Sequence, residues 1–225
     1  MKSDKSLIRQ SAWNKKVPAL SFLLFVIAFS FVSCDDDESV YPPLISELVE
    51  AVTDERGIVA GIVTDKGVCY VPQEEIISEK PDTVLRCLCG YTIAEDGMVN
   101  VYGLKQVFSQ RPIPVGEVKD ESMEPVVLRS MWNSGGYINM DIGILTTGNG
   151  THSLAFVVDS VSESSLDART TVHTRLLHKR PLEDAESYTE RLYISMPVKE
   201  YAELYDSIAV SVNTYDGLSV SKFSF

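Results

Sequence analysis

Tyr137-Ile-Asn-Met-Asp-Ile-Gly-Ile-Leu145 is predicted to form a β-strand. It is preceded by another apolar run, Val126-Val-Leu-Arg-Ser-Met-Trp132, and the hairpin signal Asn133-Ser-Gly-Gly136 lies between the two. Two such runs joined by a glycine-containing turn are typical of an antiparallel hairpin. Four more strand-like runs follow, at residues 153–159, 170–177, 188–196 and 207–215. Their number and spacing predict an immunoglobulin-like antiparallel β-sandwich over residues 125–225, in which two apolar faces cover each other.

The preceding part of the chain, residues 44–115, contains shorter strand-like runs. They lie at residues 48–52, 58–63, 68–71, 84–93 and 98–108. Turn signals that combine an acid with a glycine separate several of them, at 54–57, 65–67 and 95–97. Five short strands in about 70 residues predict a small barrel of the oligonucleotide/oligosaccharide-binding (OB) type. The expected fold class is therefore all-β, with an OB-like barrel followed by a sandwich.

Two segments interrupt the strand pattern. Residues 116–124 are polar, with few apolar side chains, and predict a linker between the two β-domains. Residues 197–206 place Tyr201, Leu204 and Tyr205 on one side of a short helix.

The first 33 residues have the features of a secretory leader. Five basic residues and one acid precede the apolar run Val17–Val32, which is shorter than the roughly 20 residues that a membrane-spanning helix needs. Cys34 follows Ser33 directly, the arrangement that bacterial lipoprotein processing requires, although Phe31 stands where Leu or Val is usual. Residues 1–33 are therefore predicted to be a lipoprotein signal peptide, with lipid attached to Cys34. The remaining alternative is an uncleaved leader with a chance cysteine.

Residues 34–43 predict an extended acidic tether, because four consecutive acids and a proline pair cannot pack a core. Acids directly after the cysteine resemble the export signal of Bacteroides-type lipoproteins that reach the outer face of the outer membrane. In enterobacteria an aspartate beside the cysteine instead resembles a signal for retention in the inner membrane. Four acids favour the surface location. The predicted export signal is Asp35, Asp36, Asp37 and Glu38.

Charge argues against a nucleic-acid partner. Removing residues 1–33 leaves 15 basic and 31 acidic residues, and therefore a net charge of −16. Proteins that bind phosphate backbones present basic patches. The densest basic run, His178-Lys-Arg180, is too short to form one.

Three cysteines remain after Cys34. Cys87 and Cys89 are one residue apart and are predicted to share one face of a strand, as small apolar residues of a sheet core. A disulfide from Cys69 to one of them is the alternative, and it is chemically permitted outside the cytoplasm.

The mature chain resembles the NigD-like lipoproteins. The resemblance rests on a lipoprotein leader with acids after the cysteine, on the OB-like and sandwich order, and on several short motifs, with Ile138 where leucine is expected. The motif residues are Trp132, Gly136, Tyr137, Asn139, His152, His178 and Pro197. The family takes its name from a bacteriocin gene cluster, so the resemblance implies an association with interbacterial competition and no assigned molecular activity.

Catalytic signatures are weak in this sequence. It contains no G-x-S-x-G elbow, no P-loop and no dinucleotide fingerprint. Alternation places His173 and His178 on opposite faces of one strand, which argues against a shared metal. We expect no cofactor and no metal.

The sequence leaves two hypotheses about function. The first is a non-enzymatic surface module that binds a protein or glycan partner and reaches the membrane only through its lipid. The second is an envelope hydrolase acting on glycan or peptide, which only the surplus of carboxylates favours.

The leader generates a direct prediction. Labelled fatty acid should be incorporated into the wild-type protein and not into Cys34→Ala, because the thiol is the expected acylation site. Equal labelling of both proteins would contradict the assignment.

Overall fold

The computed structural model describes residues 42–182, 184 and 187–225. The predicted signal peptide, Cys34 and the acids Asp35 to Glu38 lie outside the described residues. Residues Pro42–Phe225 form one compact unit. Within the described part of the chain, no helix has the length and apolar character needed to cross a membrane.

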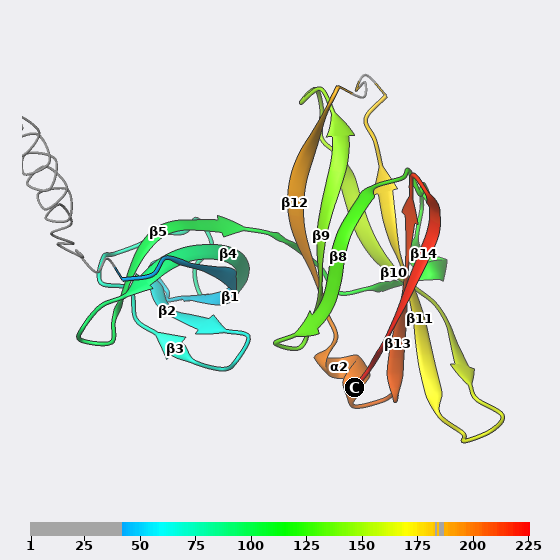
Figure 1. Ribbon diagram of the computed structural model, residues 1–225, viewed down its shortest axis with the longest axis horizontal. Coiled ribbons are helices and arrows are strands. Elements are labelled where there is room, and N and C mark those ends of the chain that lie inside the picture. The colour runs from blue at the N-terminus through cyan, green and yellow to red at the C-terminus, as the bar shows by residue number, and fades with distance from the viewer. Residues whose placement is uncertain (1–41, 183, 185–186) are drawn as a thin grey trace, which may run out of the picture. The chain divides into compact units, whose positions relative to one another are not determined.

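The first part of this unit is a five-stranded antiparallel sheet in the order β3-β2-β1-β4-β5 (Figure 1). The strands are β1 (Ile45–Thr53), β2 (Val59–Thr64), β3 (Cys69–Tyr70), β4 (Val84–Ile93) and β5 (Val99–Gln106). The two ends of the sheet meet beyond β3, where the Val99 amide donates to the Val71 carbonyl and the Gln73 amide donates to the Val99 carbonyl. This contact brings the edge strands together as in an OB-type barrel, which confirms the predicted architecture.

The second part contains two sheets, drawn as two layers in Figure 1. One has the order β6-β12-β9-β8 and the other β14-β13-β11-β10-β7. Their strands are β6 (Phe108–Ser109), β7 (Ile113–Pro114), β8 (Val127–Ser134), β9 (Tyr137–Thr146), β10 (Ser153–Glu163), β11 (Thr170–Lys179), β12 (Tyr188–Pro197), β13 (Ser207–Thr214) and β14 (Gly217–Ser224). The predicted sandwich is confirmed.

Strand β9 shows why the sandwich forms. Ile138, Met140, Ile142 and Ile144 are buried in the core between the sheets, and they alternate along the strand with Asn139 and Asp141. Because side chains on a strand alternate between its faces, the two polar residues lie on the opposite face. That face carries the contacts described in the next section.

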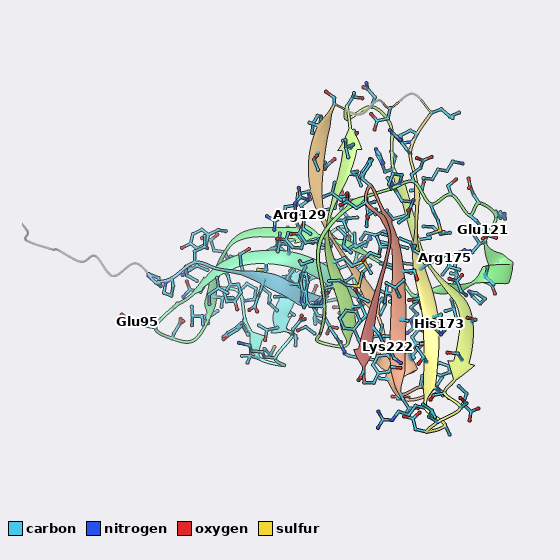
Figure 2. The ribbon with its side chains drawn as sticks, turned by 45° about the vertical axis from the view of Figure 1, so that its right-hand side comes forward. Glu95, Glu121, Arg129, His173, Arg175 and Lys222 are labelled. Atoms are coloured by element: carbon cyan, nitrogen blue, oxygen red, sulfur yellow. The ribbon has the colours of Figure 1, made fainter. Side chains whose placement is uncertain are left out.

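The polar segment at 116–124, predicted to be a linker, makes backbone contacts with the sandwich. A 3₁₀ turn, η1 (Val115–Glu117), is followed by residues that pair with the end of β11, where the His178 amide donates to the Ser122 carbonyl and the Glu124 amide donates to the His178 carbonyl. Arg175 on β11 forms an ion pair with Glu121 (Figure 2).

Two short strands before residue 115 pair across the expected domain boundary. Strands β6 and β7, which sequence assigned to the first domain, pair with β12 and β10 of the second part. Each is two residues long, too short to show its partner through periodicity. Whether the two parts fold independently stays a prediction.

The C-terminal end of the sandwich contains one expected element and one unexpected element. The short helix is present as α2 (Lys199–Ala202), within the predicted range 197–206. Strand β14 was not predicted, although Asp216-Gly217 is a turn signal and Leu218 and Val220 alternate with serines. It forms an edge of the sandwich.

The cysteines follow the first of the two alternatives. Cys87 and Cys89 are buried in the core of the first sheet, and burial raises the pKa of each thiol to about 11. Cys69 is exposed, and all three thiols are free.

The core of the sandwich yields a stability prediction. Ile142→Ala should lower the free energy of unfolding by about 2–5 kcal/mol, because it removes a fully buried side chain. Val161→Ala, at a 48% exposed position of β10, should change it by less than about 0.5 kcal/mol. Urea unfolding measures both, and similar losses would show that the assignment of faces is wrong.

Candidate functional site

A buried arginine joins the first sheet to the sandwich. Arg86 lies on β4 with its side chain 1% exposed, and its two terminal nitrogens donate to the Asp65 carboxylate at 2.6 and 2.9 Å. Such a two-point contact matches the planar guanidinium to the carboxylate. A charge this deeply buried must be paired, so the ion pair fixes the turn after β2 beside β4.

The same guanidinium reaches the polar face of β9 and β12. Its second terminal nitrogen donates to the Asn139 side-chain oxygen at 3.1 Å, and its Nε lies 3.4 Å from the Ser195 hydroxyl. Ser195 in turn donates to Asn139 at 2.7 Å. Asn139 and Ser195 are both fully buried. The Arg86 guanidinium therefore donates to oxygens from both parts of the unit, those of Asp65, Asn139 and Ser195.

Tyr137 closes the cluster from the other side. Its ring lies under the guanidinium, 4.2 Å from the ring centroid to the central carbon of Arg86, and its hydroxyl donates to Glu50 at 2.8 Å. Burial and this hydrogen bond raise the pKa of Tyr137 to about 12. The tyrosine therefore remains a neutral donor at physiological pH.

Two glycines of the β8–β9 turn permit this close packing. Gly135 and Gly136 have positive φ angles of 63° and 83°, which side chains other than glycine rarely adopt. A Cβ atom at Gly135 would overlap the Asp65 carboxylate, and one at Gly136 would overlap the Lys199 side chain. Of the motif residues, Tyr137 and Asn139 contact Arg86 directly, and Gly136 leaves room for the Lys199 side chain of the sandwich.

A groove adjoins the Arg86 cluster. Two hollows of about 340 and 360 Å³ share Leu88 and Tyr193, and together we call them the aromatic groove. Residues that define it are Glu47, Leu48, Lys66, Leu88, Trp132 and Tyr193. The volume of each hollow lies in the range of small-ligand sites.

Tyr193 is held in place within the groove. Arg191 stacks over its ring at 4.9 Å and forms a two-point ion pair with Asp141, with Nη2 2.6 Å from the carboxylate. Arg191 itself is more than half exposed. The groove therefore combines half-buried aromatic rings with the exposed cations Lys66, Lys105 and Arg191. Its lining also includes Glu47, whose carboxylate accepts a hydrogen bond from the Tyr91 hydroxyl.

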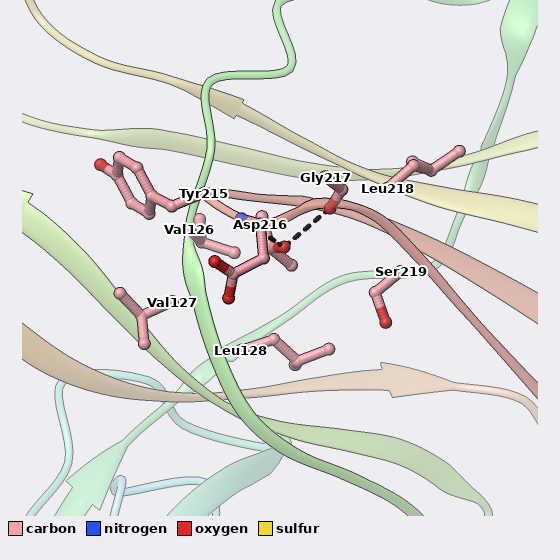
Figure 3. Close-up of a pocket in the computed structure, with 9 residues that line it drawn as sticks. Val126, Val127, Leu128, Tyr215, Asp216, Gly217, Leu218 and Ser219 are labelled. Atoms are coloured by element: carbon pink, nitrogen blue, oxygen red, sulfur yellow. Dashed lines mark hydrogen bonds between the residues drawn. The ribbon is translucent and has the colours of Figure 1, made fainter.

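A third hollow, of about 450 Å³, lies between the start of β8 and the β13–β14 turn (Figure 3). Its walls are Val126, Val127 and Leu128 on one side and residues 214–219 on the other. Asp216 is the one acid among its lining residues. We favour the aromatic groove as the candidate binding site, because it adjoins the buried Arg86 cluster.

The motif histidines lie elsewhere, in a buried cluster. The rings of His152 and His178 approach at 2.8 Å between nitrogens, and His152 contacts the Asp184 carboxylate at 2.7 Å. His173 instead contacts the Ser162 hydroxyl. Among the described residues, no group of three His, Cys, Asp or Glu side chains is arranged to hold a metal ion.

Sequence reasoning identified Trp132, Gly136, Tyr137, Asn139 and Pro197 as motif residues without assigning them a contact. Trp132 lines the groove, and Pro197 lies at the end of β12, paired with Tyr137. Sequence reasoning missed four residues, which are Arg86, Asp65, Ser195 and Asp184. The local signal that could have pointed to Arg86 is its position inside an otherwise apolar strand.

Comparison with known proteins identifies the fold. The chain resembles a NigD-like immunity protein from Bacteroides caccae, with 23% identity, a TM-score of 0.61, and coverage of 81% of this chain and 93% of that one. A Parabacteroides distasonis protein classed provisionally as toxin-related matches with 16% identity, the same TM-score and the same coverage. A Bacteroides fragilis protein classed provisionally as a lipoprotein matches with 13% identity, a TM-score of 0.60, and coverage of 82% and 98%.

The chain has the NigD-like fold. The family resemblance inferred from the motifs is thus supported by the three-dimensional structure. No family model matches the sequence, and no curated protein matches it.

The Arg86 cluster generates a stability prediction. Arg86→Ala should lower the free energy of unfolding by about 3–5 kcal/mol, because Asp65 would remain without its counter-charge. Arg169→Ala, which removes a 73% exposed arginine paired with Asp167, should cost at most about 1 kcal/mol. Urea titration of both variants measures the difference, and equal losses would contradict a special role for Arg86.

Proposed function

We propose that this protein is a non-enzymatic binding lipoprotein of the outer membrane. It is anchored through Cys34, faces the cell exterior, and uses the aromatic groove to hold a segment of a partner protein. The NigD-like fold, shared with a protein classed provisionally as a lipoprotein, supports the envelope location together with the leader sequence.

The observation that carries the proposal is the pair Trp132 and Tyr193 on the groove. They come from β8 and β12, two strands of one sheet, and the sheet is fixed against the first part of the unit by the Arg86 cluster. Aromatic side chains that are already ordered lose little conformational entropy on binding, so they are effective anchors for a partner.

Charge supports a cationic polypeptide as the partner. The mature chain has a net charge of −16, which raises the rate of encounter with positively charged molecules. The fold neighbours include one named as an immunity protein and one classed as toxin-related. We therefore propose a partner that takes part in interbacterial competition, such as a bacteriocin-type polypeptide.

The hydrolase alternative requires two carboxylates that are available for chemistry. Of the acids that line the groove, Asp65 is paired with Arg86, and Glu47 accepts the Tyr91 hydroxyl. Binding therefore accounts for the geometry better than hydrolysis.

Photo-crosslinking in intact cells tests the proposal. A photoreactive amino acid in place of Lys66, an exposed residue at the groove, should give a covalent adduct with another protein. The same amino acid in place of Leu166, which is 97% exposed on the β10–β11 connection, should give none. Trp132→Ala, combined with the photoreactive amino acid at position 66, should abolish the adduct. Higher salt should decrease the yield of the adduct.

Two outcomes would overturn the proposal. Equal adducts from both positions would mean that contact with neighbours is unspecific. Binding of purified envelope polysaccharide, with no protein adduct and with the same dependence on Trp132, would assign the groove to glycan instead.

A further inference from the structure

His152, His178 and Asp184 form a linear chain of hydrogen bonds inside the sandwich. His178 is 3% exposed, the His152 side chain 7%, and the Asp184 side chain is fully buried. The chain begins at the Glu124 backbone carbonyl, 3.1 Å from His178 Nδ1. It continues from His178 Nε2 to His152 Nδ1 at 2.8 Å and ends with His152 Nε2, 2.7 Å from Asp184. The two rings are inclined by only 14° and meet edge to edge through these nitrogens.

The number of protons in this chain follows from its ends. The Glu124 carbonyl and the Asp184 carboxylate can only accept, so the three contacts require three protons on the four ring nitrogens. Two neutral imidazoles supply only two. With only two protons, one of the three contacts would join two acceptor atoms that have no hydrogen between them. In a buried position, such a contact costs free energy.

We propose that the folded protein binds a third proton at this histidine pair near neutral pH. This proton completes the chain of hydrogen bonds and thereby stabilises the contacts between the segments that meet there. The contacts join residues 122–126, the end of β11, His152 just before β10, and Asp184. The inference is independent of the aromatic groove.

The neighbouring groups place the third proton on His152. Burial lowers the pKa of His178, which favours its neutral form. Burial acts to raise the pKa of Asp184, but hydrogen bonds from Thr146, Thr147 and His152 outweigh it and hold this pKa well below its usual range. An ionised carboxylate is thus the direct partner of the His152 imidazolium.

Other charges around the pair are already engaged. From residues 122–126, the Glu124 carboxylate pairs with Arg180 at 3.3 Å. From the end of β11, Lys179 pairs with Asp120 at 2.5 Å. The connection between β9 and β10 contributes Thr147, whose amide donates to Asp184 at 2.7 Å. Asp184 is therefore the counter-charge in contact with the histidine pair.

Nuclear magnetic resonance counts the protons directly. The sequence contains only three histidines, so ¹⁵N-histidine labelling of the mature chain without lipid (residues 35–225) gives three imidazole spin systems. At pH 7.5 we expect both nitrogens of His152 and Nδ1 of His178 to be protonated, with His178 Nε2 bare. Only two protons on the four nitrogens of the pair would overturn the proposal.

The pH dependence of unfolding provides a second test. Free histidine loses its proton near pH 6.5, so above that pH the folded chain would hold one proton that the unfolded chain releases. The stability that this third proton contributes is lost as the pH rises above about 6.5, with the folding equilibrium constant falling up to tenfold per pH unit. The slope should persist in the control His173→Gln. It should be absent in His152→Gln, in which a neutral side chain replaces the imidazole. Equal slopes in both variants would overturn the proposal.

Discussion

The buried charge of Arg86 is the constraint on which the arrangement of residues 42–225 depends. A guanidinium inside a protein is tolerated only when its donors are paired, and here the partners come from the turn after β2, from β9 and from β12. Arg86 therefore specifies which face of the sandwich meets the first sheet. The glycine pair at the β8–β9 turn and the Tyr137 ring adapt the sandwich to that arrangement.

The aromatic groove follows from this arrangement. Leu48 and Leu88 face each other across β1 and β4, next to the pair formed by Glu50 and Arg86, and they form one wall of the groove. Trp132 and Tyr193 form part of the other wall, beside Asn139 and Ser195. Because both walls are fixed by the same buried cluster, the groove is preorganised. This is the property that a binding module requires.

Turn chemistry made most of the strands predictable, because acids and glycines mark the reversals at 54–57, 65–67, 95–97 and 133–136. The contacts that define the site were not predictable in the same way. Arg86 and Asn139 are 53 residues apart, and no local pattern connects them. The histidines at 152 and 178 appeared isolated in sequence because their carboxylate partner, Asp184, lies on a connection without periodicity. The hydrogen bonds between residues 122–124 and His178 on β11 were likewise not visible in the polar composition of 116–124.

A double-mutant cycle between Arg86 and Asn139 tests the central claim most directly. Unfolding free energies of Arg86→Ala, Asn139→Ala and the double variant give the coupling between a residue of the first sheet and a residue of the sandwich. The account predicts a coupling of about 1–3 kcal/mol, in the range found for residues that share a buried network. Additive effects, within about 0.5 kcal/mol, would show that the two parts are held together without Arg86.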